Sequence, residues 1–184
     1  EAVGSASAGD TLRLCPGTWT LTITVFIDKD LTLIGAGAGA TRLDGNNAGT
    51  VLQITAGTIV TLRDLTVTKG NADFGGGIYN SGTLTLRDVS VTGNTASLAG
   101  GGIHNRATLT LQTGSSVSGN SATNRGGGIN NEGTLTLKDG SSVTGNTSRT
   151  GGGVYSLNAT MTMETGSSVS NNTATNRAGG IQNG

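Results

Sequence analysis

Aromatic residues, proline, cysteine and charged residues are all scarce in this sequence of 184 residues. Aromatics make up 3% and charged residues 12%, where about 25% charged is usual for globular proteins. So few large side chains leave little material for a rounded core. The 11 basic and 11 acidic residues cancel, so no net field attracts nucleic acid or anionic lipid. Nucleic acid is therefore not an expected partner.

Chemistry that depends on cysteine or histidine also has little support. Cys15 is the single cysteine, which excludes an internal disulfide. It follows the apolar positions Leu12 and Leu14, so we expect a buried free thiol. His104 is the single histidine and has no partner at metal-ligand spacing. We therefore expect no metal and no cofactor.

Targeting and membrane signals are missing as well. No apolar run approaches the roughly 18–20 residues that a membrane-spanning helix needs. Residues 1–10 lack the basic and apolar regions of a signal peptide. If the protein is exported, we expect its signal peptide to lie outside this sequence.

What the sequence does contain is glycine, 33 residues in all, and a repeat. Three landmarks recur together every 24 to 27 residues, which is the signature of a repeat architecture. A glycine cluster followed by Ile or Val occurs at Gly77-Ile78, Gly102-Ile103, Gly128-Ile129, Gly153-Val154 and Gly180-Ile181. A Thr-Leu-Thr-Leu segment begins at Thr83, Thr108 and Thr134, and its Met-containing form begins at Thr160. A Val-x-x-Asn segment ends at Asn94, Asn120, Asn146 and Asn172.

Within each unit the apolar residues alternate with a period of two, which indicates strands. Leu84 and Leu86 face one side, Thr83 and Thr85 face the other, and Ile78 belongs to a third short strand. One unit cannot bury its apolar side alone, so the units must stack in parallel about 4.8 Å apart. The sequence predicts an all-β, right-handed parallel β-helix of about seven coils, with three short strands per coil.

We expect residues 1–184 to form a single β-helix domain. Residues 1–65 fit the repeat loosely, as irregular N-terminal coils, and residues 66–184 fit it regularly. The sequence ends soon after Ile181 with no visible polar cap, and solenoids need capped ends. We therefore expect the chain to be a fragment of a longer array.

Two columns of asparagine support the stacking. The first comprises Asn94, Asn120, Asn146 and Asn172; the second comprises Asn80, Asn105, Asn131 and Asn183, interrupted by Ser156. A side-chain amide donates to one neighbour and accepts from the other, so stacked asparagines can satisfy one another. Asparagine also tolerates the left-handed geometry of turns. We expect these residues to be structural.

The pairing of Gly-Gly-Gly-Ile with a later Val-x-x-Asn resembles the repeat of chlamydial polymorphic outer-membrane proteins and related bacterial surface β-helices. That family uses Gly-Gly-Ala-Ile and Phe-x-x-Asn, so this sequence departs from it at Gly102 and at Val91, for example. The resemblance covers roughly residues 66–184. It implies a secreted or cell-surface location and an adhesive or passenger role, with a possible glycan or cell-surface partner.

Catalysis has one candidate pair, Asp64 and Asp88, which occupy equivalent positions in adjacent coils. Their predicted backbone separation of about 4.8 Å is near that of a retaining glycosidase pair. Each follows an arginine, however, and Lys138-Asp139 repeats the pattern, which indicates solvated turn charges. The glycine clusters lack the helix N-terminus and lysine of a phosphate loop. We predict no catalytic residues and no enzyme activity.

The outward face of the Thr-Leu-Thr-Leu segments is the candidate site. We expect a grid of threonines, without an interrupting charge, formed by Thr61, Thr83, Thr85, Thr108, Thr110, Thr134, Thr136, Thr160 and Thr162, and extended by Thr32. Spacings of about 6.6 Å along a strand and 4.8 Å between coils are expected. A second face carries a mixed pattern that includes Thr66/Thr68, Ser90/Thr92 and Ser142/Thr144.

Two interpretations of this face stay open. The grid is similar to the Thr-x-Thr faces of β-solenoid antifreeze proteins, which implies that ice or ordered water is the partner. Threonine also has a high β-propensity and suits any exposed sheet. Ice binding is our first hypothesis, and a surface adhesin or passenger-type β-helix is the alternative.

Overall fold

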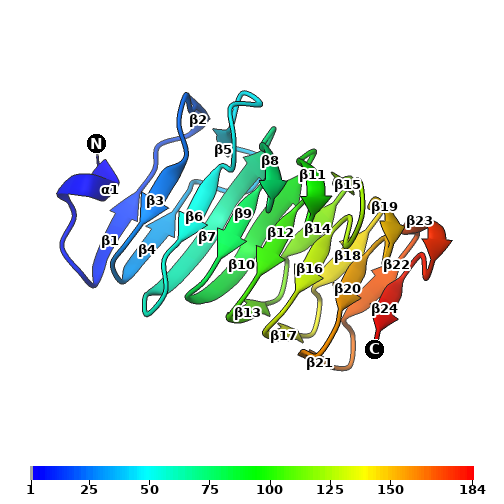
Figure 1. Cartoon of the computed structure of the whole chain (residues 1–184). Helices are drawn as coiled ribbons and strands as arrows, with labels where there is room; N and C mark the ends of the chain where they lie inside the picture. Colours follow the sequence, from blue (N-terminus) through cyan, green and yellow to red (C-terminus); the bar gives the residue numbers. More distant parts are fainter. Residues whose placement is uncertain (1) are drawn as a thin grey trace.

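The computed structural model describes residues 2–184, which form a stack of β-coils (Figure 1). A four-residue helix, α1 (Ala2–Ser5), precedes the first strand, and the described residues contain no other helix. Each regular coil contributes strands to three parallel sheets, which we name A, B and C. Within residues 2–184, no helix has the length and apolar character needed to span a membrane.

Sheet A has two arms, and the long strands β7 (Ile59–Thr68) and β10 (Thr83–Thr92) run through both. The first arm, the Thr-Leu arm, also contains β1 (Asp10–Arg13), β4 (Leu31–Ile34), β13 (Thr108–Leu111), β17 (Thr134–Leu137) and β21 (Thr160–Met163). The second, the Val arm, also contains β2 (Gly17–Thr20), β5 (Thr41–Asp44), β14 (Ser116–Ser118), β18 (Ser142–Thr144) and β22 (Ser168–Ser170).

Sheets B and C complete each coil. Sheet B stacks β3 (Val25–Ile27), β6 (Leu52–Ile54), β9 (Ile78–Asn80), β12 (Ile103–Asn105), β16 (Ile129–Asn131), β20 (Val154–Ser156) and β24 (Ile181–Asn183). Sheet C stacks β8 (Asn71–Phe74), β11 (Thr95–Ala99), β15 (Ser121–Ala122), β19 (Thr147–Thr150) and β23 (Thr173–Arg177). Seven strands stack in the Thr-Leu arm, so the predicted parallel β-helix of about seven coils is confirmed.

Alternating burial along the strands places the core inside the stack. In β10, Leu84 and Leu86 are fully buried, whereas Thr83 is exposed. The register aligns each inward leucine with its equivalent, as in Leu84 with Leu109 and Leu109 with Leu135. Continuous apolar columns therefore replace the large core side chains that the sequence lacks, because each inward residue packs against its neighbours above and below.

Both asparagine columns form the predicted ladders. In the first, the Asn94 amide nitrogen donates to Oδ1 of Asn120 at 3.0 Å, and Asn120 repeats this bond to Asn146 at 3.0 Å. The second runs from Asn80 to Asn105 at 2.7 Å and onward to Asn131 at 2.7 Å. The expected left-handed geometry is wrong for these ladder residues, since their neighbours take it instead, such as Gly119 with φ 62°.

A glycine triplet turns the chain from sheet C into sheet B. Its first member takes positive φ, as Gly100 does at 67°, which glycine adopts without steric cost. The following residue, Gly101, has ordinary φ but no space, because a Cβ there would overlap the carbonyl oxygens of Ser121 and Gly127. Positive φ therefore explains the first glycine, and close backbone approach explains the second.

Candidate functional site

The predicted threonines lie in two straight rows on the outside of the Thr-Leu arm. The inner row aligns Thr61, Thr85, Thr110, Thr136 and Thr162, and it continues through Thr32 to Thr11. The outer row aligns Thr83, Thr108, Thr134 and Thr160. All of them are exposed or half-buried. We call these two rows the threonine array.

The threonine array is narrow, because other side chains border it. In the outer row, Ile59 of β7 takes the place of threonine and is 60% exposed. Two residues beyond the inner row stands a column of long polar side chains, including Arg63, Arg87, Lys138 and Glu164. Lys138 and Glu164 form an ion pair of 2.8 Å within it. No charge lies inside the array, but a hydrated column runs beside it.

The second, mixed face differs from expectation at its N-terminal end. Thr66 and Thr68 were predicted to face solvent, but they are 3% and 4% exposed. The hydroxyl of Thr66 donates to the carbonyl of Ala38, in a loop that lies over this part of the Val arm. Thr66 can be buried under this loop because the carbonyl of Ala38 accepts the hydrogen bond that its hydroxyl donates.

The carboxylate pair Asp64 and Asp88 lies at the junction between the two arms of sheet A. Both residues have positive φ, 56° and 52°, so they sit at the kink rather than in regular strand. Asp88 lies 3.7 Å from the guanidinium of its neighbour Arg87. Neither carboxylate lines the grooves described below. Their position is that of turn charges, as their Arg-Asp pattern predicts.

A groove that sequence reasoning missed lies where sheet C turns into sheet B. Its volume is about 760 Å³. One wall comes from the end of the sheet C strands, with Phe74, Leu98 and Arg125, and the other from sheet B and the residues after it, with Tyr155 and Leu157. The full lining is Phe74, Leu98, Ala99, Asn124, Arg125, Arg149, Thr150, Tyr155, Leu157, Asn176, Arg177, Gln182 and Gly184. We call it the corner groove.

The corner groove combines exposed apolar surface with arginine. Phe74, Leu98 and Leu157 are 39–42% exposed, and they are three of the large apolar side chains that remain exposed in the described residues. The guanidinium carbon of Arg125 lies 5.1 Å from the centre of the Tyr155 ring, an arrangement that attracts the cation to the ring face. Arg149 and Arg177 also line the groove, and no acidic side chain does.

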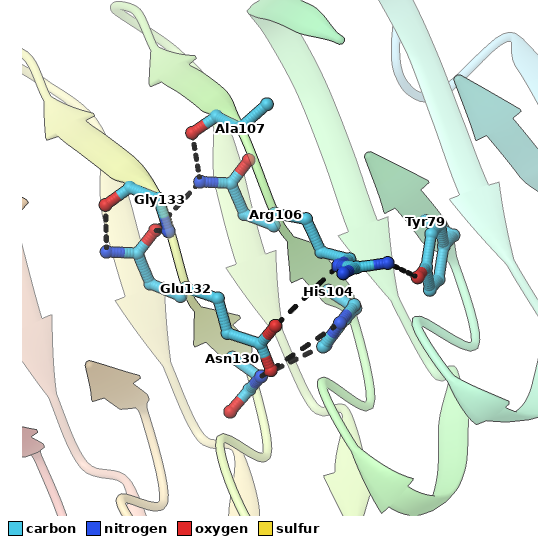
Figure 2. A network of polar contacts seen from close by, with 9 residues as sticks. Tyr79, His104, Arg106, Ala107, Asn130, Glu132 and Gly133 are labelled. Carbon is cyan, nitrogen blue, oxygen red and sulfur yellow. Dashed lines mark hydrogen bonds and ion pairs between the residues drawn. The ribbon is translucent and has the colours of Figure 1, made fainter. Parts of the chain in front are cut away.

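A polar network around His104 lies beside the corner groove, on the outer side of sheet B (Figure 2). Phe74 lines both this smaller hollow and the corner groove. The amide nitrogen of Asn130 is 3.0 Å from Nδ1 of His104, and Glu132 lies 3.8 Å from Nε2. Arg106 contacts Glu132 at 3.8 Å and donates to the Tyr79 hydroxyl at 3.2 Å.

Burial determines the protonation of His104, which is 3% exposed. Loss of solvent is the largest effect and lowers the pKa of the imidazole below its ordinary value. The charge of Glu132 raises the pKa and that of Arg106 lowers it, both by less. The rings of Phe74 and Tyr79 lie 5.1 Å and 5.0 Å from the His104 ring and supply much of the cover. Burial therefore favours the neutral form of His104.

One expected burial is wrong. Cys15 is a free and exposed thiol, because it follows β1, whose coil stacks on a neighbour on one side only. The apolar spacing of Leu12 and Leu14 does not continue into Cys15, because the strand ends at Arg13. Within residues 2–184, no three His, Cys, Asp or Glu side chains group closely enough to hold a metal ion.

The repeat explains why the corner groove was missed. Its residues vary from one coil to the next, since the equivalent positions hold Phe74, Ala99, Arg125, Thr150 and Arg177. The segment Ala-Thr-Asn-Arg recurs only in alternate coils, at 122–125 and 174–177. One signal was available. An arginine stands one or two residues before a glycine cluster in three coils, at Arg125, Arg149 and Arg177. Because the glycine clusters occupy the same place in every coil, these arginines could be placed near one another.

A comparison with protein families agrees with the fold. Residues 88–106 match the model of the Chlamydia polymorphic membrane protein (Chlamydia_PMP) repeat. The matched segment contains the ladder residue Asn94, the glycine triplet 100–102 and strand β12. The chain is a β-solenoid that carries this repeat. No curated protein sequence matches the chain significantly.

Proposed function

We propose that this chain is a non-catalytic binding module of a secreted or cell-surface protein, and that it holds its ligand in the corner groove. The repeat match supports the location, because the matching family is one of membrane proteins. The groove supports the binding role, since concave sites with apolar walls and a few polar groups are where proteins hold ligands.

The observation that carries this proposal is the gathering of exposed apolar side chains at one corner. Phe74, Leu98 and Leu157 are each about 40% exposed and line the same groove. Exposing apolar surface costs solubility, and such surface commonly marks an interaction site. Tyr155 adds an aromatic ring whose hydroxyl can hydrogen-bond while its face packs.

The composition of the groove supports binding rather than catalysis. General acid–base chemistry needs groups that exchange protons near neutral pH, most often histidine or a carboxylate. The side chains that line the corner groove include no histidine, aspartate, glutamate or cysteine. His104 lies in the neighbouring hollow, where it is buried and bonded to Asn130.

A binding array tests the proposal directly. The full chain is labelled at Cys15, which is exposed and lies outside the groove lining, and is applied to printed glycans and extracellular-matrix proteins. We expect retention on a subset of spots. Leu98→Ser and Tyr155→Ser should reduce it, because both remove contact area from the groove walls.

Ile59→Ser is the matched control. Ile59 is even more exposed than Leu98, at 60% against 39%, but it lies on the Thr-Leu arm. Retention should be unchanged in this variant. Equal retention of all three variants, or no retention of the parent chain on any spot, would contradict the proposal.

Ice binding by the threonine array is the second candidate, favoured by one observation. Seven threonines from Thr11 to Thr162 stand in one unbroken row, and four more stand beside them in register. A regular grid of methyl and hydroxyl groups on a rigid sheet loses little conformational entropy on binding. Charged side chains border the array, so its useful width is two rows.

Thermal hysteresis tests this candidate. If the array binds ice, Thr110→Tyr and Thr136→Lys should abolish most of the activity, because one bulky or strongly hydrated side chain interrupts many weak contacts. Ser142→Lys on the Val arm is the control and should have little effect. The candidate fails if the parent chain neither shapes ice crystals nor lowers their growth temperature.

A further inference from the structure

We infer that the corner groove binds an acidic polysaccharide, one whose sugars carry carboxylate or sulfate groups; this inference rests on the proposed binding function. The chain as a whole carries no net charge, yet three of its 11 basic residues line this single groove. No acidic side chain lines it. The groove is therefore a local concentration of positive charge on a neutral protein.

The three arginines are available to a ligand. None of the carboxylates in residues 2–184 forms an ion pair with Arg125, Arg149 or Arg177. Several other cations of the described residues are paired, as Lys138 is with Glu164 and Lys69 with Asp44. A planar guanidinium that is not paired with a carboxylate of the protein can hold a carboxylate or sulfate of a ligand through two parallel hydrogen bonds.

The solenoid sets the spacing of these charges. Arg125 and Arg177 occupy the same position of their coils, with Thr150 between them. Two coil steps separate their backbones by about 9.6 Å along the axis of the stack. Arg149 belongs to the coil between them, one residue earlier than Thr150. An extended polymer with repeated negative groups can meet all three, whereas a single small anion cannot.

The remaining lining suits a sugar. Asn124, Asn176 and Gln182 offer amide donors and acceptors, which pair with hydroxyl groups. Leu98 and Leu157, both partly exposed, offer apolar surface for the carbon faces of sugar rings. A volume of about 760 Å³ lies within the usual range for ligand sites and admits a few sugar units.

Single-stranded nucleic acid is the rival anionic polymer, and the groove suits it less. Sequence-tolerant binding of single strands uses successive aromatic faces on which bases stack. The corner groove has two aromatic rings, and the face of Tyr155 is already occupied by the guanidinium of Arg125. A broad basic surface is also missing, since the chain is neutral overall.

The test compares polymers that differ only in charge. The Cys15-labelled chain is titrated with polygalacturonate, its fully methyl-esterified form, dextran sulfate, plain dextran and a single-stranded oligonucleotide, and binding is followed by fluorescence anisotropy. We expect the two acidic polysaccharides to bind and their neutral counterparts to bind at least about tenfold more weakly. Added salt should weaken the acidic complexes, because the guanidinium groups are exposed.

The variants assign the effect to the groove. Arg125→Gln with Arg177→Gln should lower affinity for the acidic polysaccharides about tenfold or more, and Arg149→Gln should lower it less. Arg13→Gln removes the same charge from the exposed strand β1 and should change little. All four side chains are exposed, so the variants should keep the melting temperature of the parent chain.

The outcomes separate this inference from the proposed function. Equal binding of charged and neutral polysaccharides would overturn the acidic-ligand inference and leave the groove as a binding site. Tighter binding of the oligonucleotide, lost in the double arginine variant, would overturn it in favour of nucleic acid. Binding to none of these polymers together with an empty binding array would overturn both.

Discussion

Replacing Asn120 by alanine should destabilise the protein by about 3–5 kcal/mol. Asn120 is 1% exposed and stands in the middle of the first ladder. Its Oδ1 accepts from the backbone N–H of Asn94 at 3.0 Å, and its amide donates to the carbonyl of Val91 at 2.9 Å and to Asn146 at 3.0 Å. Alanine makes none of these bonds.

The magnitude follows from the groups left behind. The Asn94 N–H loses its acceptor in a buried place, which costs about 1–3 kcal/mol. The bonds to Val91 and Asn146 contribute about 1 kcal/mol each. Against a typical total stability of about 5–15 kcal/mol, this loss is large. Urea denaturation followed by far-ultraviolet circular dichroism measures it as a shift of the unfolding midpoint.

Two further variants show whether hydrogen bonding or lost volume causes the effect. Asn176→Ala removes an exposed asparagine and should change stability by less than about 0.5 kcal/mol. Asn120→Asp keeps the shape but places a carboxylate against Oδ1 of Asn146, so it should destabilise at neutral pH at least as much as alanine. The ladder reasoning is refuted if the free energies of unfolding of Asn120→Ala and Asn176→Ala agree within about 1 kcal/mol. It is also refuted if Asn120→Asp does not lower the free energy of unfolding.

Three other changes test separate parts of the structure. Gly101→Ala should cost about 3 kcal/mol or more, because its Cβ would overlap the carbonyl oxygens of Ser121 and Gly127; Gly180→Ala, which meets nothing within 4 Å, should leave the melting temperature unchanged. Since burial lowers the pKa of His104 in the folded state, the unfolded state binds the proton more tightly, and the free energy of unfolding should fall as pH drops below about 6.5. His104→Gln should flatten that dependence in urea titrations at several pH values, and an equal slope in both proteins would contradict it. Cys15 should react with a maleimide without denaturant, and a reaction that requires urea would show that its thiol is covered.

The parts of the fold that repeat could be predicted from the sequence. The Leu84 and Asn94 positions recur in every regular coil. A parallel stack brings these equivalent residues into register, so that the leucines pack on one another and the asparagines hydrogen-bond. Burial at Cys15 and exposure at Thr66 were wrong for a common reason. Both lie in or beside the irregular N-terminal coils, where the chain departs from the repeat: strand β1 ends before Cys15, and a loop covers Thr66.

The candidate sites divide in the same way. The threonine array could be predicted because threonine repeats at one position of the coil, so alignment alone brings Thr85 and Thr110 together. The corner groove could not be predicted, because neighbouring coils place different residues in it and it forms at a bend between two sheets whose angle no single motif encodes. Phe74 and Tyr155 are separated by 81 positions (155 minus 74), and only the stacked geometry places them along one hollow.

The direction of the backbone hydrogen bonds has a mechanical consequence. In a parallel stack the bonds between coils run along the length of the rod, as from Gly101 N to the Gly126 carbonyl oxygen and from Gly127 N to the Gly151 carbonyl oxygen. A pull on one end of the chain opens the bonds of the terminal coil one after another, whereas the bonds between two interior coils share the same load. The molecule should therefore yield by peeling, one coil at a time, and each released coil of 25 or 26 residues adds slack of up to about 3.3 Å per residue. A solenoid that yields in this way lengthens under tension, while the coils that are still stacked keep their shape.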